Sequence, residues 1–208
     1  METHTAGAER LKAFTDAVVA IALTLLILPL MESVGESARE HGTAGEWIAG
    51  HSDQLFSFVL SFVLIASFWL GHHRLFEGVH RTTRALLSLT VAWMFTIVWL
   101  PVATAIVGQM PNDIVQKGLY IGALFATSVM ALVIDIYVGR HPELHDIPEP
   151  RLRSGLVAHG IAAGLFLAAF ALAALIPAVG YWAMFLLLLT GPLHALIWKR
   201  VSRHQSST

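Results

Sequence analysis

Long apolar runs alternate with short polar segments along the whole chain. A membrane-spanning helix needs about 20 mostly apolar residues. Six runs are that long, at residues 13–31, 54–72, 85–108, 114–138, 155–176 and 178–198. The last two are separated only around Pro177, which predicts a tight helical hairpin rather than one long helix. The pattern therefore predicts an all-α membrane protein with six transmembrane helices.

Basic residues gather on one side of this predicted topology. With six spans both termini share a side, and eleven of the thirteen Lys and Arg residues fall there: Arg10, Lys12, Arg74, Arg81, Arg84, Arg140, Arg151, Arg153, Lys199, Arg200 and Arg203. Only Arg39 and Lys117 fall opposite, together with a predicted acidic loop at 32–53. Because cytoplasmic segments carry the excess of Lys and Arg, we expect a multi-pass plasma-membrane protein with both termini in the cytoplasm.

The first apolar run also has features of a cleaved signal peptide, since a basic segment precedes a short hydrophobic stretch. Asp16 interrupts that junction, however, and removing the run would leave five spans and spoil the charge pattern. We therefore interpret residues 1–208 as a single six-helix transmembrane domain.

Composition narrows the classes of function. The chain is 56% hydrophobic and only 13% charged, with a mean hydropathy of +0.67. Its net charge of -1 does not favour a nucleic-acid partner. With no cysteine, it can form neither disulfides nor thiolate metal sites. No H-E-x-x-H, P-loop or nucleophile-elbow pattern occurs, so we expect no enzyme, no resident metal and no cofactor.

Asp16 is the most unusual polar residue, because it stands at the head of the first apolar run. An ionised carboxylate near a bilayer is costly unless a partner or water meets it. The predicted topology brings the end of the second span to the same depth, where His72 and His73 lie. We expect Asp16 to contact one of them, His73 first. Such a network either locks two helices together, or supports a pore helix and titrates near neutral pH.

An apolar stripe follows on the same helix. Ile21, Leu25 and Leu28 fall at i, i+4 and i+7, and Thr24 lies beside them. Apolar residues at this spacing usually pack against neighbouring helices. In a bundle of such helices they would instead form hydrophobic rings that gate by dewetting, with Thr24 offering hydroxyl oxygens to a cation. Periodicity alone leaves both interpretations open.

Other polar residues within the spans are interpreted more simply. Asp135 lies near the end of the fourth span and is expected to pair with Arg140. His159 and His194 are expected at the membrane interface.

Two motifs resemble those of a known family. Arg10-x3-Phe14-Thr15-Asp16 resembles the R-x3-F-S-D signature of the transmembrane protein 175 family, potassium channels of bacteria, endosomes and lysosomes. Thr15 replaces the family's Ser and keeps the hydroxyl. The run Trp69-x2-His72-His73-x2-Phe76 is similar to the family's second landmark. The third span departs from the family, because Pro101 is followed by Val102 where Phe is usual.

The resemblance implies a homotetrameric channel of bacterial type without a T-V-G-Y-G filter, a sequence that this chain lacks. The first helices would line the pore, with Ile21, Leu25 and Leu28 as its constriction and Thr24 as a polar layer for selectivity. The motif residues would be structural support, namely Arg10, Phe14, Thr15, Asp16, Trp69, His72 and His73. Potassium would pass as a transient ion, modestly preferred over sodium.

Two other classes of function stay open. A proton-coupled secondary transporter would use Asp16 and His72 or His73 as a proton relay, but such carriers have inverted repeats and broken helices that the sequence does not show. A membrane scaffold without transport is the third possibility. The favoured prediction is a passive monovalent-cation channel in the lipid bilayer.

Overall fold

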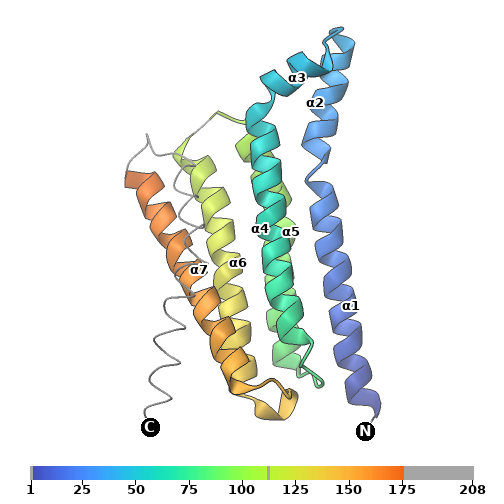
Figure 1. Cartoon of the computed structure of the whole chain (residues 1–208), viewed down its shortest axis with the longest axis vertical. Coiled ribbons are helices and arrows are strands. Elements are labelled where there is room, and N and C mark those ends of the chain that lie inside the picture. The colour runs from blue at the N-terminus through green and yellow to red at the C-terminus, as the bar shows by residue number, and fades with distance from the viewer. Residues whose placement is uncertain (1, 112, 176–208) are drawn as a thin grey trace.

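The computed structural model describes residues 2–111 and 113–175, and these form an all-helical bundle (Figure 1). The long helices are α1 (Glu2–Leu25), α4 (Ser52–Phe76), α5 (Arg84–Gln109), α6 (Ile114–Gly139) and α7 (Glu149–Leu175), and α2 (Leu28–Arg39) extends α1. Within these residues, five segments are long and apolar enough to span a membrane: 7–39, 52–76, 84–109, 114–139 and 149–172. They correspond to the first five predicted spans. The sixth, 178–198, and the hairpin at Pro177 lie outside the described residues.

The first span differs from the prediction in being broken. The α1 helix ends at Leu25, and α2 begins at Leu28 with Pro29 in its first turn. Proline has no N–H and its ring clashes with the preceding turn of a continuous helix, whereas the first turn of a new helix accepts it. The Ile27 N–H turns back to Thr24 O at 3.3 Å, which tightens the last turn of α1. The run 13–31 is therefore two helices that share one direction.

The acidic segment 32–53 was expected to be a loop, and this prediction is wrong. Most of it is helical, since α2 extends to Arg39 and α3 covers Ala44–Gly50. Thr43 begins α3 with a capping box: its hydroxyl accepts the Glu46 N–H, and the Glu46 carboxylate accepts the Thr43 N–H. Acidic residues alone do not predict a loop when caps and helix formers are present.

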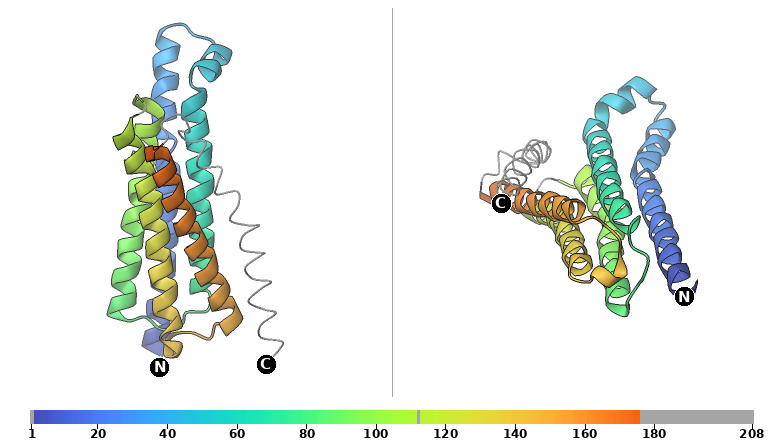
Figure 2. Two further views of the ribbon diagram at one scale, coloured as in Figure 1. Left: turned by 90° about the vertical axis from the view of Figure 1, so that its left-hand side faces the viewer. Right: turned by 60° about the horizontal axis from the view of Figure 1, so that its bottom comes forward.

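The core lies along α5 and α6, in the middle of the bundle. The α6 helix packs against α5 on one side and α7 on the other, while α1 packs against α5 and α4 at the opposite edge (Figures 1 and 2). Trp93, Tyr120, Ile97 and Leu124 are among its fully buried side chains. Among the described helices, α1 is therefore covered on one face only.

Serines made the second predicted span look weak, and two of them serve the core. Ser61 of α4 is buried and lies 2.8 Å from the Tyr120 hydroxyl of α6, while the Thr104 hydroxyl of α5 donates to Ser61 Oγ at 2.8 Å. Ser57 is also buried, and its hydroxyl donates to Gln54 O. Because hydroxyls buried in a membrane bundle need partners, Ser61 joins α4 to α5 and α6, and Ser57 is satisfied within its own helix.

One end of the bundle carries most of the described basic residues. The start of α1, the α4–α5 connection and the α6–α7 connection all lie at that end, together with Arg10, Lys12, Arg74, Arg81, Arg84, Arg140, Arg151 and Arg153 (Figure 1). Arg39 and Lys117 lie towards the other end. The three basic residues after 198 are outside the described residues, so the shared side of the two termini stays a prediction.

The two connections at the basic end are tied together, and we call the pair the clasp (residues 77–83 and 140–148). Val79 and His145 form an isolated β-bridge, and the His80 N–H donates to Leu144 O at 2.9 Å. The His80 ring lies 2.9 Å from the Asp146 carboxylate. Gly78 is required here, because a Cβ at this position would lie 2.4 Å from Ile147 Cγ1. The clasp therefore fixes α4 and α5 relative to α6 and α7.

Candidate functional site

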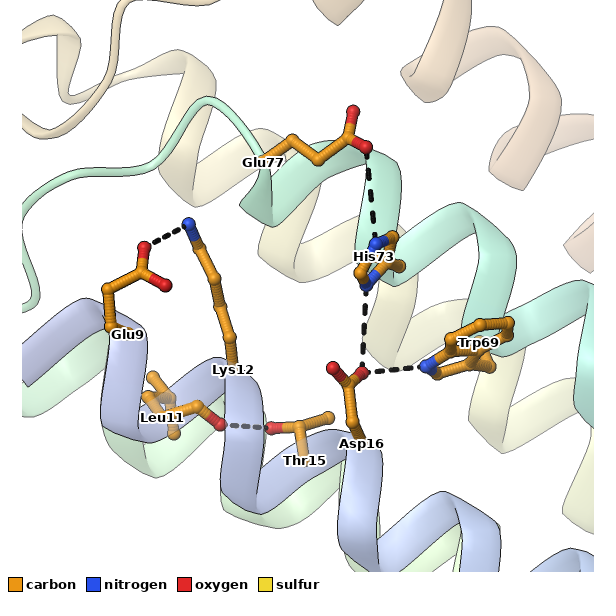
Figure 3. Close-up of polar contacts among 8 residues, drawn as sticks. All are labelled: Glu9, Leu11, Lys12, Thr15, Asp16, Trp69, His73 and Glu77. Carbon is orange, nitrogen blue, oxygen red and sulfur yellow. Dashed lines mark hydrogen bonds and ion pairs between the residues drawn. The ribbon is translucent and has the colours of Figure 1, made fainter.

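Asp16 joins α1 to α4 at the basic end of the bundle (Figure 3). Its Oδ1 accepts a 2.7 Å hydrogen bond from Trp69 Nε1 and lies 3.7 Å from His73 Nδ1. Trp69 and His73 stand one turn apart on α4, with their ring centroids 5.2 Å apart. The expected contact between Asp16 and His73 is therefore present, and the indole of Trp69 supplies the shorter bond.

The contacts continue from His73 towards α7. The second ring nitrogen of His73 lies 4.0 Å from Glu77 Oε1, and Glu77 Oε2 lies 3.5 Å from Arg151 Nη2. Sequence reasoning did not identify Glu77, although its i, i+4 spacing from His73 is a usable signal. These contacts thus run from Asp16 on α1 through His73 and Glu77 to Arg151 on α7.

His72 does not take part in these contacts, although the sequence left it as an alternative partner of Asp16. It is buried, and its ring stacks on Phe76 at 4.2 Å and on Trp93 at 4.4 Å between centroids. Within the described part of the chain, its Nε2 has no hydrogen-bond partner. His72 therefore belongs to the α4–α5 core and not to the surroundings of Asp16.

The remaining motif residues lie on different faces of α1. Thr15 is fully buried, and its hydroxyl donates to Leu11 O at 2.9 Å. Phe14 and Arg10 are both exposed, and Arg10 lies near the basic end of the bundle. The structure thus brings Asp16, Trp69 and His73 together, and it does not add Phe14 or His72 to them.

The apolar stripe lies on the face of α1 and α2 that the other described helices leave open. Ile21, Leu25 and Leu28 are 58%, 39% and 51% exposed, whereas Val19, Ala22 and Leu26 on the opposite face are buried. Thr24 is also exposed, and its hydroxyl donates to Ile21 O at 2.8 Å. That bond uses the hydroxyl proton and leaves oxygen lone pairs for another ligand. Packing among the residues that the structure describes therefore does not explain the stripe.

A second acid–histidine pair was missed in the sequence. Asp135 of α6 lies beside His159 of α7, rather than in the expected pair with Arg140, and both side chains are largely buried. Among the residues that the structure describes, no three His, Cys, Asp or Glu side chains are arranged to hold a metal ion.

Residues 10–101 match the family model of the endosomal/lysosomal potassium channel TMEM175. A potassium channel of Streptomyces collinus is 32% identical over 123 residues, which cover 58% of this chain and 56% of that protein. A potassium channel of Chamaesiphon minutus is 26% identical over 173 residues, 78% of this chain and 82% of that one. The zebrafish endosomal/lysosomal proton channel TMEM175 is 25% identical over 68% of this chain, a match that spans only 27% of the fish protein.

Solved structures show the same fold. The crystal structure of a lysosomal potassium-selective channel TMEM175 homologue from Chamaesiphon minutus superposes with a TM-score of 0.64 at 22% identity, covering 96% of this chain and 98% of that one. The potassium channel MtTMEM175, crystallised as a T38A variant, gives a TM-score of 0.63 at 16% identity, with 93% of each chain covered. The family match over residues 10–101, which hold both motifs, and the bacterial relatives thus show that this chain is similar to TMEM175 ion channels.

Proposed function

We propose that this chain forms a homotetrameric, potassium-preferring cation channel whose pore is lined by α1. The observation that carries the proposal is the uncovered stripe at Ile21, Leu25 and Leu28, on a helix whose other face is packed against α4 and α5. Four such helices around an axis would cover the stripe and form a pore. The bacterial relatives are named potassium channels, which supports this choice of ion.

The proposed gate is hydrophobic. Seven residues of helix rise by about 10 Å, so the stripe makes a stack of apolar rings rather than one ring. A narrow apolar stack expels water, and an ion that cannot keep its hydration shell does not pass. Four Thr24 hydroxyl oxygens on the same face would replace part of that shell. Potassium gives up water more readily than sodium, so a single hydroxyl ring favours it modestly.

The proposal also assigns a role to the contacts of Asp16. Trp69 and His73 hold the carboxylate at the base of α1, and Glu77 continues the contacts to Arg151 on α7. These contacts would fix the tilt and rotation of α1, and so the direction in which the stripe faces. With its basic end in the cytoplasm, as the distribution of Lys and Arg favours, the network lies at the inner mouth of a plasma-membrane channel.

Electrical recording tests the proposal directly. The purified protein is reconstituted in a planar bilayer with potassium on one side and sodium on the other. We expect a passive current whose reversal potential is shifted from zero towards the equilibrium potential of potassium. A current that requires a second, coupled solute, or the lack of any current from protein of native mass, would overturn the proposal.

A second candidate is proton conduction or proton-coupled transport, because the vertebrate relatives are named proton channels. Asp16 and His73 are the groups available for a relay on α1 and α4, and the position of His72 in the core removes it from that path. Recording under a pH gradient with impermeant ions replacing potassium and sodium distinguishes this candidate. A current that follows the proton gradient alone would favour it.

A further inference from the structure

Asp135 and His159 form an acid–histidine pair that the proposed channel does not use. Asp135 Oδ2 lies 2.5 Å from His159 Nδ1, with side-chain exposures of 3% and 14%. The pair joins α6 to α7, the two helices on the side of the bundle away from α1 (Figure 2). Within the described residues, the hydrogen bond and ion pair of Asp16 are made with Trp69 and His73, and those of Asp135 with His159, so the pair is a separate feature of the chain.

Two glycines allow α7 and α4 to pack closely against the pair. A Cβ at Gly155 of α7 would lie 3.4 Å from Asp135 Oδ2, and a Cβ at Gly71 of α4 would lie 3.0 Å from His159 Nε2. The next residue of α4 is His72, whose buried Nε2 has no hydrogen-bond partner within the described residues. The pair thus lies between α6 and α7, with Gly71 of α4 against the His159 ring.

We propose that Asp135 and His159 form an internal proton-binding site of the chain. Enclosed charges are costly unless they are balanced. An ionised Asp135 beside a neutral His159 leaves one negative charge enclosed, and one added proton on His159 makes the pair electrically neutral. That proton comes from solvent, and no bond between heavy atoms changes. Binding of the proton therefore strengthens the attachment of α7 to α6, and its release weakens it.

Charged and titratable groups on α4, α6 and α7 surround the pair. A positive charge on His159 would repel one on His72 of α4. The next residue of α4, His73, faces Asp16 and Glu77. On α7, Arg151 pairs with Glu77 and Arg153 pairs with Glu149. On α6, Arg140 is exposed after the end of the helix. Repulsion from a protonated His159 opposes a charge on His72, so the one added proton is held on His159.

The first test measures thermal unfolding of the purified full-length protein against pH. Histidine is the side chain whose charge ordinarily changes between about pH 5 and 8. Over the range from about pH 6 to 9 we expect the native protein to lose several degrees of Tm as the pair gives up its proton. Asp135→Asn keeps the shape of the side chain and removes the enclosed charge, so its Tm should change much less over the same range.

A matched pair of variants controls for histidine titration elsewhere. Asp146→Asn removes the carboxylate of the exposed His80–Asp146 pair in the clasp. Over the same pH range, Asp146→Asn should lose as many degrees of Tm as the native protein does. If the native protein and Asp135→Asn show the same pH profile of Tm, the proton-binding site is disproved.

A second readout remains decisive even if Asp135→Asn folds poorly. Nitrogen NMR of protein labelled in its histidine rings reports the charge of each imidazole, and His159→Gln identifies the signal of His159 by its loss. We expect this ring to carry two protons in the native protein near pH 7. A neutral His159 throughout the range would overturn the inference. Neither measurement uses ion current, so the outcome is independent of the proposed channel activity.

Discussion

Two adjacent histidines at the end of α4 have opposite environments, and the phase of the helix explains why. His72 continues a buried face with Ile65, Phe68 and Phe76, spaced at three and four residues. His73 stands four residues after Trp69 and faces Asp16. The depth argument from the sequence correctly favoured His73. The periodicity of the buried face would also have excluded His72, and that signal was present in the sequence.

Trp69 provides the sharpest test of the Asp16 contacts. Trp69→Phe keeps an aromatic ring and removes the N–H that donates to the carboxylate. A hydrogen bond to a charged group contributes about 1.5–3 kcal/mol, and we expect the lower part of that range because Asp16 is only half-buried. In thermal unfolding, Trp69→Phe should have a lower Tm than Trp47→Phe, which removes a donor to the neutral Ser33 hydroxyl. Equal losses would show that the charge of Asp16 adds nothing.

Thr24 decides whether the polar layer selects ions. Its hydroxyl bonds its own helix at Ile21 O, three residues back, which is the simpler of its two roles. If its oxygen also meets the ion, Thr24→Ala should reduce the preference for potassium, whereas Thr24→Ser should keep it. Reversal potentials under a potassium/sodium gradient measure the change. A preference that survives in Thr24→Ala assigns the hydroxyl to the helix alone.

At the scale of the elements, the sequence predicted the existence of the helices better than their ends. Apolar runs located the first five spans, because about 20 apolar residues in a row have few alternatives to a spanning helix. The run 13–31 hid a break at Pro29, since hydropathy does not register a missing N–H. The capping box at Thr43 and Glu46 likewise overrode the acidic composition of the predicted loop.

The stripe predicts a change of current when it is made polar. Ile21→Asn would admit water to an apolar ring, so we expect a larger single-channel conductance in planar bilayers. Val91→Asn is the matched control, because Val91 is 51% exposed on α5 and has no place in the proposed pore. It should leave the conductance unchanged. An unaltered current in Ile21→Asn would assign Ile21 to packing between helices.

The clasp predicts a pH effect outside the membrane spans. The hydrogen bond from His80 lowers the pKa of Asp146 below its ordinary value of 3.8. A lowered pKa means that the carboxylate stabilises the fold above its ordinary value, and that this contribution is lost as the pH falls through the lowered value. Asp146→Asn should therefore have a lower Tm than the native protein at neutral pH. The difference should shrink below about pH 4, and a difference that stays constant down to acid pH would contradict this.

At the scale of the whole molecule, a single subunit leaves its proposed pore face open. Hydropathy predicted the five spans that the structure describes, and the distribution of Lys and Arg predicted the basic end of the bundle. Both patterns follow from the properties of the bilayer. The contacts of Glu77, Asp135 and His159 were not predicted, since they depend on how helices distant in sequence pack. Tetramer formation is likewise a property of surfaces between subunits, which the sequence suggests only through the family motifs.

Assembly can be tested with little background, because the chain has no cysteine. Native mass measurement should show four copies of the 22.7 kDa chain. If α1 and α2 meet at a common axis, a single cysteine at Leu28 should form disulfide-linked dimers under mild oxidation, since Cα atoms must approach within about 7 Å. A cysteine at Phe95, 72% exposed on α5, should not. Monomers by mass, or equal cross-linking at both positions, would exclude a tetramer with its first helices at the centre.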